Sequence, residues 1–270
     1  MTAWLSLAAC TTSSQQKDLI LGIQGAGGLT ETERQFKPLA DYLSQSLSRN
    51  VKVEVMPSYQ AGMNSIKIHK YAMAKLGPYA YATLPVNSGY KLFAGESSKG
   101  LPYYYSVFIA RADSNIKELS DARGKRVALG DPLSTSQSVL INRELASLGL
   151  SAGVDYTVVR LDNHKAILNA LASNKADIGP VSSRFLPKIL AASPTLFSDL
   201  VVIGNSRRIP NDAWVIDSTL PSDLKSKIED AFFSLDDTKV TEEIENVDLF
   251  RNVSDDEYDF LRTTPRSAKK

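Results

Sequence analysis

The stretch KRVALGDPLSTSQSVLINRELASLGL, residues 125–150, decides the fold because it has the pattern of a strand, a turn and a helix. Residues 126–129 are a short, mostly apolar run that favours a β-strand, and the Gly-Asp-Pro sequence at 130–132 ends it. Apolar side chains then recur every three to four residues, which predicts a helix. These apolar positions are Val139, Leu140, Leu145 and Leu148.

Three hydroxyl residues, Ser134, Thr135 and Ser136, stand where this helix should begin. The first backbone N–H groups of a helix have no partner within the helix and carry a partial positive charge, so they attract anions. Hydroxyl groups add further donors. A single N-cap residue would explain one of the three hydroxyls but not all of them. We therefore predict an anion-binding site here rather than a simple helix cap.

The composition argues against several classes of protein. The chain has 270 residues, which is enough for two lobes or one large α/β domain. Its 31 basic and 30 acidic residues give a formal net charge of +1, whereas a nucleic-acid-binding protein usually shows a basic excess. No segment approaches the ~18 consecutive apolar residues of a membrane-spanning helix. We expect neither a nucleic-acid partner nor a transmembrane segment.

The residues that bind metals or form disulfides are scarce. The sequence has one cysteine, Cys10, and two histidines, His69 and His164. One cysteine excludes an intrachain disulfide, and this set argues against a structural zinc site. We predict no metal and no cofactor.

Residues 7–10, Leu-Ala-Ala-Cys, are similar to the lipobox of bacterial lipoproteins, in which the cysteine is lipidated and all preceding residues are removed. The polar residues 11–16 then have the character of a tether. The preceding apolar run is short and contains no Lys or Arg, which departs from a complete signal peptide. A truncated or misassigned start would explain this departure, and a chance match is the alternative. The resemblance implies a membrane anchor at Cys10, with residues 1–16 as signal remnant and tether.

Strands and helices alternate along nearly the whole chain. Besides residues 126–129, we predict strands at residues 19–23, 51–55, 103–110, 156–161, 176–179, 200–204 and 213–216. We predict helices at about residues 36–47, 61–71, 139–148, 164–173, 183–192, 221–233, 238–246 and 254–261. The glycine-rich turn at 25–28 lacks the spacing of a dinucleotide-binding loop. The alternation predicts the α/β class, with βαβ units and mostly parallel sheets.

Several segments agree with one family in their order and spacing. The strongest are GKRVA at 124–128 and DPLSTS at 131–136. Supporting segments are LGPYAYA at 76–82, YYSV at 104–107, His164 with Ala170, Asn174 and Asp177, and IPNDAW at 209–214. Over about residues 18–235 the chain resembles the periplasmic solute-binding proteins of phosphonate, phosphite and phosphate ABC importers.

The resemblance implies the type II periplasmic binding protein fold, with two α/β lobes of mostly parallel sheets around a cleft. Two crossover strands would act as the hinge. We expect lobe one at residues 18–105 plus 208–265 and lobe two at residues 106–207. A ligand that binds the closed state more tightly than the open state would close the lobes. We expect a periplasmic monomer whose partner is an ABC transporter permease.

The resemblance also implies which residues bind the ligand, a small phosphorus oxyanion. Ser134, Thr135 and Ser136 would bind its oxygens through hydroxyl and backbone N–H groups, which suit a ligand rich in acceptors. The other implied ligand residues are Tyr59 from the opposite lobe, Tyr105 on the hinge strand, His164 at a helix start and Asp212 after the second crossover. Taken singly, the tyrosines could be packing residues, His164 a residue at a helix start, and Asp212 part of a turn.

Asp212 has a specific chemical consequence. An ionised carboxylate only accepts hydrogen bonds, so it can bind an oxyanion only where that anion carries a proton, as in a P–OH group. A fully ionised or proton-free anion such as sulfate would leave buried oxygens unpaired against Asp212. This predicts that the site rejects sulfate.

Arg184 is the main departure from the family. Phosphonate-binding members can hold the amino group of their ligand with an acidic residue at the aligned position. Arginine offers no acceptor and repels an ammonium group. We expect a preference for phosphate, phosphite or a phosphonate with a second negative group over 2-aminoethylphosphonate. The alternative is that Arg184 points to solvent or pairs with an exposed acid.

Two other function classes stay open at this stage. A sensory binding protein would pass the same lobe closure to a membrane receptor, and nothing in the sequence separates it from a transport protein. A phosphate-ester hydrolase could use a serine with His164 and Asp212, but the sequence has neither a nucleophile elbow nor a pair of metal-binding carboxylates. We therefore predict that the protein is not an enzyme.

Overall fold

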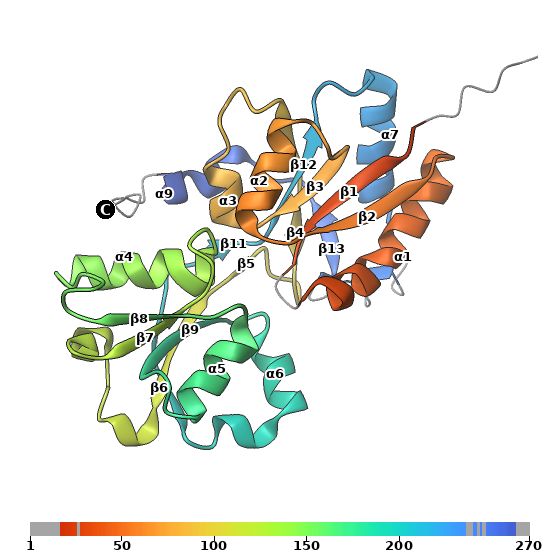
Figure 1. The fold of residues 1–270 in the computed structure, drawn as a ribbon. Helices are drawn as coiled ribbons and strands as arrows, with labels where there is room; N and C mark the ends of the chain where they lie inside the picture. The colour runs from red at the N-terminus through yellow and green to blue at the C-terminus, as the bar shows by residue number, and fades with distance from the viewer. Residues whose placement is uncertain (1–16, 26–27, 236–239, 242–243, 245–246, 263–270) are drawn as a thin grey trace, which may run out of the picture.

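The computed structural model describes residues 17–25, 28–235, 240–241, 244 and 247–262. They form two β-sheets, each with helices on both faces, and a two-stranded ladder between the sheets (Figure 1). We refer to the larger sheet and its helices as lobe one, and to the smaller sheet and its helices as lobe two.

Lobe one is built on a mixed sheet with the strand order β13-β4-β12-β3-β1-β2. Its strands are β1 (Leu19–Gln24), β2 (Val51–Met56), β3 (Met73–Leu76), β4 (Tyr90–Ser97), β12 (Ala213–Asp217) and β13 (Leu249–Arg251). β1 pairs parallel with β2 and β3, whereas β12 runs antiparallel to its neighbours β3 and β4. β3 and β4 therefore end at the edge where β12 begins.

Helices cover both faces of this sheet. The helices α1 (Leu29–Leu47) and α7 (Ser222–Phe233) pack on one face, and α2 (Tyr59–Lys67), α3 (Pro78–Ala82) and α9 (Asp259–Arg262) pack on the other. The three- to four-residue spacing of Phe36, Leu39 and Leu43 gives α1 its buried face. Burial of such apolar faces is the dominant favourable term in folding.

Lobe two has the strand order β10-β6-β9-β7-β8. Its strands are β6 (Ser106–Arg111), β7 (Arg126–Leu129), β8 (Thr157–Arg160), β9 (Ile178–Ser182) and β10 (Leu200–Asn205). β7 pairs parallel with β8 and β9, whereas β6 is antiparallel to β9 and β10. The helix α4 (Leu140–Ser147) covers one face, and α5 (His164–Ala172) and α6 (Leu186–Ala192) cover the other.

The chain crosses between the sheets twice, and the two crossovers pair with each other. The short strands β5 (Tyr103–Tyr104) and β11 (Ile209–Pro210) form an antiparallel ladder in which Tyr104 faces Ile209. Figure 1 shows this ladder in the narrow region between the lobes. The sequence-predicted strand at 103–110 is thus two strands, interrupted at Tyr105.

The α/β class is confirmed, but both sheets are mixed rather than mostly parallel. The crossovers explain the difference. β6 and β12 each enter their sheet from the edge that faces the other lobe, so they run against the neighbouring parallel strands. The strand β4 was not predicted, because Lys91, Glu96 and Ser97 make it more polar than a central strand usually is.

Some predicted features lie in residues that the structure does not describe, and the boundaries of one predicted helix differ from those observed. Cys10 and the helix start at 238–239 lie outside them. The helix predicted at 61–71 spans Tyr59–Lys67 in the structure. It begins earlier than predicted because Ser58 caps it by accepting a hydrogen bond from the Ala61 N–H at 3.1 Å. Within the described ranges, no helix has the length and apolar character needed to cross a membrane.

Candidate functional site

A cleft of about 530 Å³ lies between the two lobes. All of the sequence-predicted ligand residues except Tyr105 line it. They are Tyr59, Ser134, Thr135, Ser136, His164, Arg184 and Asp212. Residues far apart in the sequence thus meet in one place.

The position of the cleft follows from the direction of the parallel strands. We refer to Ser134, Thr135 and Ser136 as the hydroxyl loop. In lobe two, this loop, His164 and Arg184 follow the carboxyl ends of β7, β8 and β9, respectively. In lobe one, Gln24, Tyr59 and Lys75 lie at or after the carboxyl ends of β1, β2 and β3. Ligands of open α/β sheets bind outside the carboxyl ends of their strands. Here both sheets direct those ends at the same cleft.

The hydroxyl loop starts the helical segment that leads into α4. Residues Thr135–Val139 form a single π-helical turn, a feature that is frequent at functional sites. Ser134, Thr135 and Ser136 are all buried, and the Ser134 hydroxyl accepts a hydrogen bond from the Gln137 N–H at 3.3 Å. Ser134 is therefore a helix cap as well as a cleft residue. The cap alternative and the predicted ligand role do not exclude each other.

Thr135 also connects the two lobes. Its hydroxyl oxygen accepts a hydrogen bond from the Tyr79 N–H of α3 at 2.9 Å. Because a hydroxyl group carries both lone pairs and a proton, this contact leaves the Thr135 proton available for an acceptor in the cleft. The loop therefore keeps donor capacity while its position is fixed against lobe one.

His164 is a buried, neutral hydrogen-bond donor. It is the first residue of α5, and Asn163 caps that helix by accepting from the Ala166 N–H at 2.9 Å. Its Nδ1 accepts a hydrogen bond from the Ser182 N–H at 3.3 Å, which assigns the proton of the neutral ring to Nε2. Burial and the nearby Arg184 charge lower the pKa of His164 to about 3. The ring stacks on Phe185, with the centroids 4.9 Å apart.

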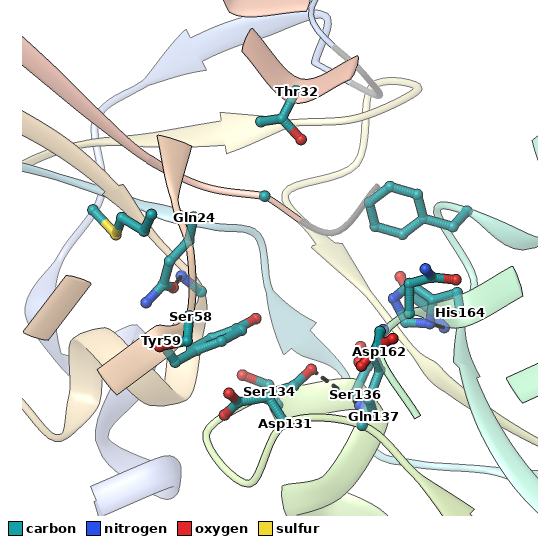
Figure 2. A pocket seen from close by; sticks show the side chains of 18 of the residues that line it. Gln24, Thr32, Ser58, Tyr59, Asp131, Ser134, Ser136, Gln137, Asp162 and His164 are labelled. Atoms are coloured by element: carbon teal, nitrogen blue, oxygen red, sulfur yellow. Dashed lines mark hydrogen bonds between the residues drawn. The ribbon is translucent and has the colours of Figure 1, made fainter. Parts of the chain in front are cut away.

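The opposite wall of the cleft comes from lobe one. Figure 2 shows Gln24, Ser58 and Tyr59 across the open space from His164, with Ser134 close to Tyr59. Burial and the negative charge of Asp212 raise the pKa of the Tyr59 phenol well above its usual value, while a hydrogen bond with Ser134 acts against them. Tyr59 therefore stays a neutral hydroxyl that can donate into the cleft.

Of the two neighbouring tyrosines in the first crossover, Tyr104 lines the cleft and Tyr105 does not. Successive side chains of a strand point to opposite sides, so a shift of one residue moves the phenol from one side to the other. Tyr105 lies between β5 and β6, where its hydroxyl accepts a hydrogen bond from Arg208 Nε at 3.4 Å and its ring lies edge-on to Tyr103. The structure thus places Tyr104 in the cleft lining, where the sequence led us to expect Tyr105.

Three charged residues that line the cleft, Lys75, Arg184 and Asp212, form a cluster with the buried Glu96, and we call these four side chains the charged floor. Lys75 Nζ forms an ion pair with Asp212 Oδ2 and lies 3.7 Å from Glu96 Oε1. Arg184 comes from lobe two and bonds Glu96 Oε2 at 3.0 Å, and its Nη1 lies 3.6 Å from Asp212 Oδ2. The indole N–H of Trp214 donates to Glu96 Oε1 at 2.9 Å. The cluster contains equal numbers of positive and negative groups.

The protonation of the two acids follows from their partners. Burial acts to raise the pKa of the Asp212 carboxyl, but the adjacent Lys75 and Arg184 charges outweigh it, so that the pKa of Asp212 lies below its usual range. For Glu96, which is fully buried, burial dominates and raises the pKa, against the opposing charges of Lys75 and Arg184. The pKa values of the two acids of the floor are therefore shifted in opposite directions.

Arg184 does not point to solvent. Its side chain is only 6% exposed and bridges lobe two to Glu96 in lobe one. This contact excludes the alternative of an exposed ion pair. It also shows that the arginine charge is largely compensated before a ligand enters.

The sequence reasoning missed Lys75, Glu96, Gln24 and Tyr104. Two of them carry a signal that is visible in the sequence, since Lys75 and Glu96 are charged residues inside otherwise apolar strands. Charged residues are almost never fully buried unless they are paired. No comparable signal marks Gln24. Its side-chain carbonyl accepts from the Gly77 N–H at 2.7 Å, while its buried amide nitrogen has no hydrogen-bond partner among the residues that the structure describes. Within the described residues, no group of three or more His, Cys, Asp or Glu side chains is placed to hold a metal ion.

Solved structures with the same fold identify the architecture of this protein. The structure aligns with the binding protein component of an ABC phosphonate transporter from Pseudomonas aeruginosa with a TM-score of 0.81 and 23% identity, covering 92% of this chain and 85% of the other. It aligns with PhnD1 from Prochlorococcus marinus in complex with methylphosphonate with a TM-score of 0.78 and 16% identity, covering 91% and 96%. These alignments confirm the predicted type II periplasmic binding protein fold.

Comparison of sequences places the family. The chain is 25% identical over 233 residues to the phosphonates-binding periplasmic protein of Escherichia coli, which covers 84% of this chain and 69% of the relative. The phosphate-import protein PhnD of Mycolicibacterium smegmatis is 24% identical over 215 residues, covering 75% and 67%. The family model of the ABC transporter phosphonate periplasmic substrate-binding proteins matches residues 29–258. The chain therefore belongs to this family of periplasmic substrate-binding proteins of ABC transporters.

Proposed function

We propose that this protein captures a small phosphorus oxyanion, a phosphonate, phosphite or phosphate, in the interlobe cleft and delivers it to an ABC transporter permease. The observation that carries the proposal is the lobe-two wall, where three adjacent hydroxyls and a neutral imidazole converge at the carboxyl ends of parallel strands. Tyr59 and Tyr104 add phenol donors from the other side. A tetrahedral oxyanion offers acceptor oxygens in several directions, and this arrangement supplies donors in several directions.

The ligand class is narrowed by Arg184. Its guanidinium lies on the charged floor, where related proteins can hold a ligand ammonium group with an acid. An ammonium group placed there would compete with Lys75 and Arg184 for the same two acids, Glu96 and Asp212, which is unfavourable in a buried setting. We therefore propose that 2-aminoethylphosphonate binds less tightly than methylphosphonate, phosphite or phosphate.

Lobe closure is the proposed transport signal. The ladder of β5 and β11 is the hinge, residues 18–105 plus 208–265 form one moving unit, and residues 106–207 form the other. The ligand would favour closure because it contacts Tyr59 in one lobe and the hydroxyl loop in the other. We further propose that the protein acts as a monomer anchored through a lipid on Cys10.

The contacts of His164 favour binding over hydrolysis. In a catalytic triad, the nitrogen of His that faces away from the nucleophile donates to a carboxylate. Here Nδ1 of His164 accepts from a backbone N–H, and the carboxylate of Asp212 is paired with Lys75. A sensory role remains compatible with the same cleft, because closure can be read by a receptor as well as by a permease.

Isothermal titration calorimetry tests the function directly. Phosphate, phosphite, methylphosphonate, 2-aminoethylphosphonate and sulfate would each be titrated into the protein. Replacing Trp4 by Phe leaves Trp214, which bonds Glu96 beneath the cleft, as a fluorescence reporter. We expect micromolar or tighter binding of at least one phosphorus oxyanion, and weaker binding of 2-aminoethylphosphonate. Heat and fluorescence that stay unchanged with all five ligands would refute the proposed function.

A further inference from the structure

Lys75 is the lysine of the charged floor. It is the third residue of β3, its side chain is 8% exposed, and it lines the cleft. A lysine costs several kcal/mol to bury, so it is retained only where partners compensate its charge. Its Nζ pairs with Asp212 and lies near Glu96, and the Phe36 ring lies 5.9 Å from it.

The ion pair with Lys75 determines whether Asp212 needs a hydrogen-bond donor from the ligand. An ionised carboxylate without a partner needs a proton from the ligand, and that would restrict binding to anions that carry a P–OH group. In this structure Asp212 Oδ2 already has a donor in Lys75, and Arg184 Nη1 lies 3.6 Å away. The Lys75 ammonium has three N–H groups, so it can serve Asp212 and still offer a donor to the cleft.

We propose that Lys75 is a specificity-determining residue that lets the cleft bind a phosphorus oxyanion in its fully ionised, proton-free form. The proposal rests on the proposed function and adds the protonation state of the ligand to it. It also revises the role expected of Asp212 from the sequence, since the Lys75–Asp212 pair presents both a donor and an acceptor. Rejection of proton-free anions then no longer follows from Asp212.

Other ionisable groups face the pair from several elements, and among the described residues none of them replaces Lys75. The acids and phenols are Glu96 from β4, Tyr59 from α2, Tyr104 from β5 and Tyr258 from the segment before α9. The remaining cation is Arg184 after β9, which is already bonded to Glu96 at 3.0 Å. Removing the lysine charge would therefore leave two acids with one cation.

The test is the pH dependence of methylphosphonate affinity. Calorimetry would compare the wild type, Lys75→Met and the matched surface control Lys67→Met at several pH values that bracket the second pKa of the ligand. If the ligand must carry a proton, its affinity falls about tenfold for each pH unit above that pKa. Over the two pH units above that pKa, we expect the affinity of the wild type and of Lys67→Met to change less than about threefold, and that of Lys75→Met to fall by about tenfold per unit.

A double variant covers the risk that Lys75→Met does not fold. Lys75→Met/Asp212→Asn restores the charge balance of the floor, and the Asn amide offers both a donor and an acceptor. Its affinity should depend as little on pH as that of the wild type. A wild-type affinity that falls about tenfold per unit, or a flat profile for a folded Lys75→Met, would overturn the proposal alone. Failure of the wild type to bind methylphosphonate, phosphite or phosphate at every pH would instead remove the proposed function, and this inference with it.

Discussion

The lobe-two wall and the charged floor of the same cleft differ in charge. The wall presents neutral groups, with the hydroxyls of Ser134, Thr135 and Ser136 beside an uncharged His164. The floor holds four charged residues that are paired with one another across the lobes. Neutral donors can meet any tetrahedral oxyanion, whereas paired charges respond to the charge and protonation of what enters. The comparison suggests that the wall provides capture and that the floor provides selection.

The largest expected effect comes from breaking the floor. Glu96→Ala removes the partner of Arg184, Trp214 and Lys75 at a fully buried position. Removing one member of a buried ion pair typically destabilises a protein by about 3–5 kcal/mol, because the other charge stays buried. Urea unfolding would measure the change. Glu33→Ala, at an exposed position of α1, is the matched control and should change stability by less than about 0.5 kcal/mol. Equal stability of the two variants would show that the floor is solvated.

Removing a hydroxyl from the lobe-two wall should weaken ligand binding. Ser136→Ala removes one cleft hydroxyl, and a hydrogen bond to a charged group contributes about 1.5–3 kcal/mol, which is roughly a 10- to 150-fold change in Kd. Calorimetry with methylphosphonate would measure it, with the exposed Ser147→Ala of α4 as the control. If Ser136→Ala binds as tightly as the control, the hydroxyl loop is a structural cap and not a ligand site.

The neutrality of the wall can be tested through the pH dependence of stability. Burial, followed by the Arg184 charge, lowers the pKa of His164 from 6.5 to about 3, so the unfolded chain binds more protons between these values and stability falls as pH falls below 6.5. This loss amounts to at most about 1.4 kcal/mol per pH unit. The free energy of unfolding of His164→Gln relative to wild type should therefore improve as pH drops from 6.5 to 4.5. It should stay constant between pH 6.5 and 8, and a constant difference over the whole range would mean that His164 can be charged in the folded state.

The smallest expected effect separates two neighbouring tyrosines. Tyr104→Phe removes a phenol that lines the cleft, and a typical hydrogen bond contributes about 0.5–1.5 kcal/mol, or roughly two- to tenfold in Kd. Tyr105→Phe removes a hydroxyl that contacts Arg208 outside the cleft, so its Kd should equal that of the wild type. A larger loss for Tyr105→Phe would reverse the assignment that the structure makes.

The parts of the site that could be predicted are those that a short segment defines. The strand, turn and helix around the hydroxyl loop follow from local apolar spacing and from Gly130, and the same holds for His164 behind its Asn163 cap. The choice between Tyr104 and Tyr105 depends on a different kind of information. Three consecutive tyrosines at 103–105 give no local sign of which one faces the cleft, and the pairing of β5 with β11 decides it.

The α/β class, the family resemblance and the donor chemistry of the hydroxyl loop can all be inferred from the order of residues, because each depends on residues that are close together in the chain. The tertiary structure decided the mixed order of the sheets and the composition of the charged floor. Lys75, Glu96, Arg184 and Asp212 come from four separate segments. A buried charge is stable only through partners that folding brings to it, and periodicity along the chain contains no information about which distant residues those are.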